Sequence, residues 1–202
     1  NVVDGIRISD SLGIFLNNGP LTINTASSDG IDNAGYFQSF NTIDISGAGS
    51  NGINNKSTGV FVNGRFPITI DGGTATTDGI SNEGQFINQA DGTINVIHAA
   101  DDGIETIGKV FQNDGTINIT MRDGATSTQN GLSIGTGTKL GHFINTSNNS
   151  LNIYSLDLMT SRLINIAVNS VFDNSGFVSL QDSFISSNAS IYSAGLVNNL
   201  LN

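Results

Sequence analysis

The stretch FQNDGTINI at residues 111–119 recurs as FINQADGTINV at residues 86–96 and, in looser form, as FINTSNNSLNI at residues 143–153. A catalytic site needs its residues once, whereas a structural unit that stacks on copies of itself is repeated many times. The sequence therefore predicts a repeat protein, whose recurring residues describe a scaffold before they describe a function.

Three landmarks define the repeat. The tripeptide Asp/Asn-Gly-Ile/Leu recurs at irregular intervals with its glycine at Gly5, Gly30, Gly52, Gly79, Gly103 and Gly131. A phenylalanine follows it, at Phe15, Phe37, Phe61, Phe86, Phe111, Phe143 and Phe172. Two positions later comes an asparagine, at Asn17, Asn63, Asn88, Asn113, Asn145 and Asn174, with Ser39 in one repeat. Two aliphatic residues separated by one position then complete each repeat, as in Ile117 and Ile119.

The local period of two predicts short strands, and glycine, asparagine and aspartate separate three of them in each repeat. Three short strands with their turns make up one coil of a parallel β-helix, and parallel crossovers are overwhelmingly right-handed. The expected fold is all-β: a single-stranded right-handed parallel β-helix, or solenoid, of about seven to eight coils with three short strands per coil.

The stacking of coils explains the recurring residue types. We expect the phenylalanines to stack in the core and the asparagines to form a ladder in which each side-chain amide hydrogen-bonds to the next coil. The corner glycines are expected to supply a positive φ. The corner aspartates would stack as like charges, so we expect them to turn into water, with a shared cation as the alternative.

The repeat is more regular in the first part of the chain. We expect residues 1–202 to form one β-helix domain, with regular Asp/Asn-Gly coils over residues 1–154 and degenerate coils over residues 155–202 that end in mid-coil. The sequence has no signal peptide, no long apolar run and no initiator Met. We therefore expect a mature or excised piece of a longer protein.

Composition excludes several classes of function. The chain has no Cys, which excludes disulfides and thiolate metal sites, and its net charge is -10. Such a charge opposes binding to nucleic acid or to anionic membranes, and no segment predicts membrane insertion.

One outer face is expected to be apolar. Residues between the paired aliphatics, such as Asp44 and Asn118, and residues after the corner, such as Asp32, are polar and predict two solvated faces. The neighbours of the phenylalanines are instead largely aliphatic: Ile14, Leu16, Val60, Val62, Ile87, Val110, Ile144 and Val171. Either another segment of the parent protein covers this candidate association face, or a second rod packs against it. The open ends of the coils offer a further route to self-association.

Coils such as DGISNEGQFINQADGTINV at residues 78–96 resemble those of right-handed β-helices on secreted bacterial surface proteins, such as autotransporter passengers and large repetitive adhesins. The resemblance covers the chain from about Asp4 to Leu180. It implies an extracellular or cell-surface location and structural or adhesive work, with extracellular glycans or a host surface as further partners. It transfers no functional residue, and the calcium-binding nonapeptide of toxin-type β-rolls is absent.

The alternative function is that of a polysaccharide lyase or hydrolase, or of a phage-type glycan-binding fibre. Enzymes of this kind need clustered carboxylates, and the best local candidate is HAADDGIE, with His98, Asp101, Asp102 and Glu105. His142 follows later, but a polygalacturonase-like site would also need Asn-Thr-Asp, Gly-His-Gly and a basic triplet, which are absent. We therefore expect no catalysis and assign no catalytic, cofactor-binding or metal-binding residue. Ice binding would need a regular Thr array, which TATT at 74–77, TST at 126–128 and TGT at 136–138 do not form.

Overall fold

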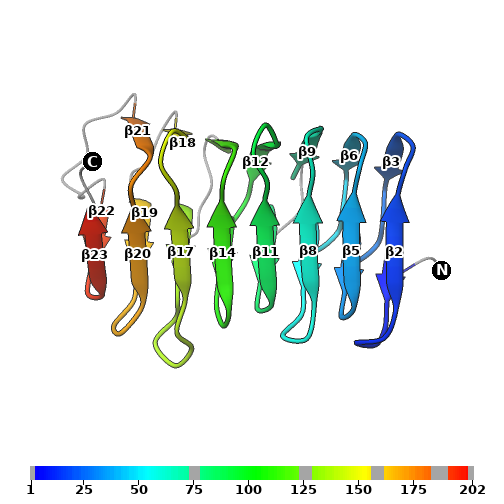
Figure 1. Cartoon of the computed structure of the whole chain (residues 1–202), viewed down its shortest axis with the longest axis horizontal. Helices are drawn as coiled ribbons and strands as arrows, with labels where there is room; N and C mark the ends of the chain where they lie inside the picture. The colour runs from blue at the N-terminus through cyan, green and yellow to red at the C-terminus, as the bar shows by residue number, and fades with distance from the viewer. Residues whose placement is uncertain (1–2, 73–77, 123–128, 156–161, 183–190, 200–202) are drawn as a thin grey trace.

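The computed structural model describes residues 3–72, 78–122, 129–155, 162–182 and 191–199. Over these residues the chain is all-β and winds into three parallel sheets, which stack along one long axis (Figure 1). This confirms the predicted right-handed parallel β-helix, with about seven coils and three strands per coil. Each coil adds one strand to sheet A, then one to sheet B, then one to sheet C.

The strands have the following bounds. Sheet A contains β1 (Ile6–Ile8), β4 (Ile31–Asn33), β7 (Ile53–Asn55), β10 (Ile80–Asn82), β13 (Asp102–Thr106), β16 (Asn130–Ile134), β19 (Arg162–Ile166) and β22 (Ile191–Ser193). Sheet B contains β2 (Ile14–Asn17), β5 (Tyr36–Ser39), β8 (Val60–Asn63), β11 (Gln85–Asn88), β14 (Val110–Asn113), β17 (His142–Asn145), β20 (Val171–Asn174) and β23 (Leu196–Asn199). Sheet C contains β3 (Leu21–Asn24), β6 (Ile43–Ser46), β9 (Pro67–Asp71), β12 (Thr93–Ala99), β15 (Thr116–Met121), β18 (Ser150–Ser155) and β21 (Phe177–Asp182).

The phenylalanines form one continuous stack inside sheet B, because the strands pair with identical residues in register. Neighbouring rings from Phe15 to Phe143 lie nearly parallel, with centroids 4.5–5.1 Å apart. Phe143 and Phe172 are instead edge to face, at 5.8 Å and 70°. The stack thus changes its geometry in the C-terminal coils, while the division at residues 154/155 itself stays a prediction.

Columns of aliphatic residues complete the core. Ile31, Ile53, Ile80 and Ile104 follow one another in register along sheet A and are fully buried. The paired aliphatics of sheet C form two similar columns, as in the register of Ile94 with Ile117. A fully buried isoleucine contributes roughly 1.5–3 kcal/mol relative to an exposed one, so the repeated column is the main source of stability.

Two ladders of polar side chains run inside the rod. In the predicted ladder of sheet B, the Nδ2 of Asn63, Asn88 and Asn113 each donates to Oδ1 of the asparagine on the following coil, at 2.8 Å. A second ladder in sheet A links Asn33 to Asn55 and Asn55 to Asn82 at the same distance. These amides lie in the interior, where an unpaired polar group would be costly, so the ladders fix the register of the coils.

The corner glycines are needed for a different reason than predicted. Among the described residues, the glycines with positive φ are Gly47, Gly108 and Gly135, and no corner glycine is one of them. A Cβ at Gly30 would instead lie 2.5 Å from Cγ2 of Ile45 and 2.6 Å from the carbonyl oxygen of Gly52. The corner therefore requires glycine because the backbone passes too close to the next coil for any side chain.

Candidate functional site: the acidic face of sheet A

Two columns of polar residues lie along sheet A and together form what we call the acidic face. The outward residues of the strands are in register: Arg7, Asp32, Asn54, Ser81, Glu105, Ser133 and Asn165. The residues before the corner glycines form the second column: Asp4, Asp29, Asn51, Asp78, Asp102 and Asn130. The second column thus repeats the order Asp, Asp, Asn twice along the axis.

The corner aspartates do not turn into water, which corrects the expectation from sequence. Asp4, Asp29 and Asp102 are more than nine-tenths buried. Oδ1 of each accepts the backbone N–H of the corner residue on the next coil: Asp4 from Asp29 at 3.2 Å, Asp29 from Asn51 at 3.0 Å and Asp102 from Asn130 at 3.0 Å. The carboxylate satisfies a backbone donor that the tight corner leaves without a strand partner, and this holds it inside the turn.

The asparagines of this column keep it from being an unbroken stack of carboxylates. Asn51 donates its Nδ2 to Oδ1 of Asp29 at 3.1 Å, and Asn130 donates its Nδ2 to Oδ1 of Asp102 at 2.7 Å. Asn51 also accepts the backbone N–H of Asp78 at 3.3 Å. Asn51 thus accepts the backbone N–H of the next coil, as an aspartate would. It also donates a hydrogen bond to the carboxylate of Asp29 on the preceding coil.

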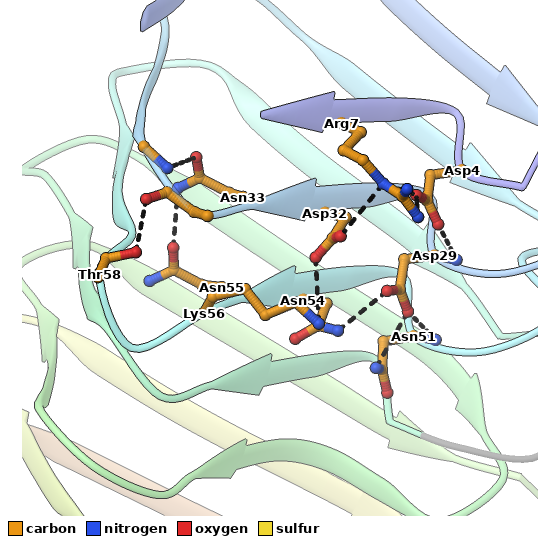
Figure 2. Close-up of polar contacts among 12 residues, drawn as sticks. Asp4, Arg7, Asp29, Asp32, Asn33, Asn51, Asn54, Asn55, Lys56 and Thr58 are labelled. Atoms are coloured by element: carbon orange, nitrogen blue, oxygen red, sulfur yellow. Dashed lines mark hydrogen bonds and ion pairs between the residues drawn. The ribbon is translucent and has the colours of Figure 1, made fainter. Parts of the chain in front are cut away.

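The N-terminal coils of the acidic face carry two cations, as Figure 2 shows. Arg7 contacts Asp4 through Nε at 2.6 Å and Asp32 at 3.5 Å. Lys56 lies 3.3 Å from the other oxygen of Asp32. Asn54 adds a neutral donor, with its Nδ2 2.9 Å from Oδ2 of Asp29. Every carboxylate of this group therefore has a cation or an amide at its oxygens.

The middle coils have the same motif, but among the described residues no cation forms an ion pair with Asp78 or Asp102. Burial and, to a smaller extent, the nearby carboxylates of Asp102 and Glu105 together raise the pKa of Asp78 to about 8. Burial raises the pKa of Asp102 to about 7, against the effect of the Asn130 amide. Burial also raises the pKa values of Glu105 and Asp101. At neutral pH Asp78 therefore holds a proton that it loses in the unfolded chain.

The two histidines lie away from this cluster. His98 is the second-last residue of β12 in sheet C, where its Nδ1 is 3.1 Å from Oδ1 of Asp71. His142 lies on β17 in sheet B, with Nε2 2.7 Å from Oδ2 of Asp173. Each histidine thus contacts an aspartate of an adjoining coil, and the two belong to different sheets. The structure brings together Asp101, Asp102 and Glu105, whereas the two histidines contact aspartates outside this group.

No group of three or more acidic, His or Cys side chains in the described part of the chain is arranged to hold a metal ion. The described residues also include no helix that is long and apolar enough to cross a membrane. Of the Thr tracts weighed for ice binding, residues 74–77 and 126–128 lie outside the described residues, and residues 136–138 lie in a bend after β16.

The candidate association face lies on the outside of sheet B, and its exposure is uneven. Ile14 is 70% exposed and Leu16 is 51% exposed. The side chains of Val60, Ile87, Val110, Ile144 and Val171 are half-buried. Val62 is only 6% exposed and so adds little to the surface. Of the residues predicted for this face, the exposed ones are therefore on β2 at the N-terminal coil, while Leu196 on β23 is a further aliphatic side chain, 54% exposed, at the other end of the sheet.

Two features of sheet A and its corner were not found from sequence. The second asparagine ladder was missed, although its signal is visible in DGIDN, NGINN and DGISN, where an asparagine stands three positions after each corner glycine. The Asp, Asp, Asn order of the corner was also missed, because the tripeptide treats Asp and Asn as equivalent. Comparison with protein-family models, with curated proteins and with solved structures returned no match to this chain.

Proposed function

We propose that this chain is a structural or adhesive rod that works outside the cell, associates with copies of itself and carries out no catalysis. The observation that carries the proposal is that the recurring side chains contact the equivalent residues of neighbouring coils. The phenylalanine stack and the two asparagine ladders use these side chains along most of the described rod. The resemblance to surface β-helices supports the extracellular location.

Self-association is supported by the apolar surface at the N-terminal coil. Ile14, Leu16 and Leu12 are 70%, 51% and 88% exposed, and they lie on or just before β2. Apolar surface of this kind is stabilised when another surface removes it from water. A second rod that packs along sheet B would cover these side chains.

Electron microscopy of the purified chain at neutral pH tests the assembly. We expect filaments or laterally paired rods. Isolated rods at every concentration would contradict self-association and leave a monomeric rod.

A charge-introducing variant tests which surface is used. The double variant Ile14→Glu, Leu16→Glu should reduce assembly, because it places two charges on the proposed contact, and it should leave the fold intact. The matched control is Thr22→Glu, Asn24→Glu, which changes two exposed residues of the same coil on sheet C. If both double variants assemble equally well, the face on β2 is not the interface.

A second candidate function is favoured by the raised pKa values on the acidic face. Asp78 and Asp102 have pKa values of about 8 and about 7, so one carboxyl can hold a proton at neutral pH while another is ionised. Hydrolysis of glycosides uses one protonated and one ionised carboxyl group. A reducing-end assay over a broad panel of polysaccharides should detect cleavage if this function holds, and Asp102→Asn should abolish it. No cleavage of any polysaccharide would contradict it.

A further inference from the structure

The turns that join sheet B to sheet C differ in length from one coil to the next. Coils are numbered from the N-terminus, with β1, β2 and β3 in coil 1. The turn of coil 4 consists of residues 89–92 and that of coil 6 of residues 146–149, whereas the turn of coil 5 consists only of Asp114 and Gly115. Because coils stack directly on one another, a short turn between two longer turns leaves a notch in the edge of the rod.

The two walls of this notch have the same construction. The third residue of each long turn has a positive φ, 66° at Asp91 and 67° at Asn148. At the floor, a Cβ on Gly115 would lie 2.7 Å from the carbonyl oxygen of Gln89. The short turn therefore fits closely under its neighbour, and the notch is a fixed feature of the backbone.

The notch opens into a hollow of about 710 Å³ that is lined by Arg65, Ile87, Gln89, Ala90, Asp114 and the turn at 146–149. The hollow is open to solvent rather than enclosed, so a ligand in it would keep part of its surface in water. The lining combines one cation, one carboxylate and several amide and hydroxyl groups with the aliphatic side chains of Ile87 and Ala90.

The carboxylate at the floor is held in place. Gln112 donates its Nε2 to Oδ2 of Asp114 at 2.6 Å, and the Thr146 hydroxyl donates to Oδ1 at 2.8 Å. Asn149 donates its Nδ2 to that hydroxyl at 2.6 Å. Each carboxylate oxygen can accept more than one hydrogen bond, so Asp114 is both oriented and still able to accept from a ligand.

Arg65 supplies donors at the other side of the hollow. Its side chain is exposed, and among the described residues it forms no ion pair. Its guanidinium offers five N–H donors in a fixed plane. The hollow therefore presents a fixed acceptor, a set of donors and an aliphatic patch in one place.

We propose that this notch at coil 5 binds a neutral, hydroxyl-rich saccharide. Sugar hydroxyls donate to a carboxylate and accept from a guanidinium or an amide, and the C–H faces of a sugar ring pack on aliphatic side chains. A neutral ligand is specified because the chain has a net charge of -10, which repels polyanions. The proposal rests on the adhesive part of the proposed function and is independent of self-association.

Saturation-transfer NMR with the purified chain tests the site, with maltotriose, cellotriose, mannotriose and chitotriose as neutral probes and trigalacturonate as the anionic counterpart. We expect at least one neutral probe to bind. Arg65→Ala and Asp114→Ala should each weaken that binding about tenfold, because each removes a hydrogen-bonding partner of the ligand. The matched control is Asp44→Ala, an exposed aspartate on sheet C, which should bind as the unchanged chain does.

An insertion provides a second variant that acts on the shape of the notch. Two extra residues between Asp114 and Gly115 would give coil 5 a turn as long as those of coils 4 and 6. We expect this variant to lose saccharide binding and to keep its circular dichroism, with a lower thermal midpoint because Asn113 loses its hydrogen bonds to Gly115. Binding of trigalacturonate alone, no binding of any neutral probe, or binding that survives Arg65→Ala, Asp114→Ala and the insertion would overturn the proposal. Filament formation measured on the same samples would show separately whether self-association fails.

Discussion

Coils 1–3 and coils 4–5 share one corner motif but compensate its charge by different means. In coils 1–3, Arg7 and Lys56 contact Asp4 and Asp32. In coils 4–5, no described cation forms an ion pair with Asp78 or Asp102, and desolvation raises their pKa values to about 8 and about 7. The comparison teaches that a repeated acidic motif brings like charges close together on adjacent coils. A cation, an amide donor or a bound proton can each reduce the repulsion between them.

The largest effect is expected when the carboxyl group of Asp78, on coil 4, is replaced by an amide, which is neutral at every pH. Folded Asp78 keeps a proton up to about pH 8, whereas the unfolded chain loses it near the ordinary value of 3.8. Stability from this group is thus fully present below about pH 4 and is lost as the pH rises through 8, by about 1.4 kcal/mol per pH unit for each proton retained. Asp78→Asn should flatten this slope and stabilise the protein at pH 9 by on the order of 3 kcal/mol.

Urea unfolding at several pH values from 4 to 9 measures that slope. Asp44→Asn on the outer face of sheet C is the matched control and should keep the slope of the unchanged chain. If the free energy of unfolding changes equally with pH in Asp78→Asn and in the unchanged chain, the folded chain does not hold a proton on Asp78.

A smaller effect is expected when the amide that separates the two pairs of aspartates is removed. Asn51→Asp keeps the acceptor for the backbone N–H of Asp78 but loses the donor to Asp29 and adds a charge between the two. The free energy of unfolding should fall by about 2 kcal/mol at pH 7, with recovery near pH 4 as the new carboxyl is protonated.

The matched control for this change is Asn24→Asp, because Asn24 is exposed and its Oδ1 accepts the Ser46 hydroxyl at 2.8 Å, which an aspartate can also do. Chemical denaturation at pH 4 and pH 7 compares the two variants. A similar loss for both would mean that the position of Asn51 in the column is of no consequence.

The smallest effect is expected when a cation of the N-terminal coils is removed. The Lys56 side chain is 43% exposed, and its Nζ lies 3.3 Å from Asp32. Exposed ion pairs contribute roughly 0.2–1 kcal/mol, so Lys56→Gln should cost less than about 1 kcal/mol, and added salt should reduce the difference. Thermal unfolding at low and high salt measures it. A cost that exceeds this range and persists in salt would place Lys56 in the buried part of the network instead.

The fold was predictable because the same residue types recur at the positions that stack. Phe86 and Phe111 pair in register, as do Asn88 and Asn113, and these positions were visible in the sequence as repeated phrases. Stacking is a property of the repeat itself, so one sequence was enough to predict three strands per coil.

The chemistry of the corner was not predictable in the same way. Whether Asp29 turns inward or outward depends on a backbone N–H that only the closed corner leaves available. The reason for Gly30 likewise lies in the distance to the next coil, which no local pattern contains. The notch at Asp114 arises from a difference in turn length between coils, and that comparison needs strand bounds more exact than a sequence pattern supplies.

The asparagine ladders also contribute a dipole moment along the axis of the rod. In sheets A and B every ladder amide donates toward the following coil, as Asn55 does to Asn82 and Asn88 does to Asn113. The outward column of sheet C runs the other way, with Asn118 donating to Asn95. Aligned amide dipoles add, as they do along a helix, so the two parallel columns inside the rod reinforce each other. Two such rods attract each other most strongly when they lie antiparallel side by side or follow one another in the same direction along one axis.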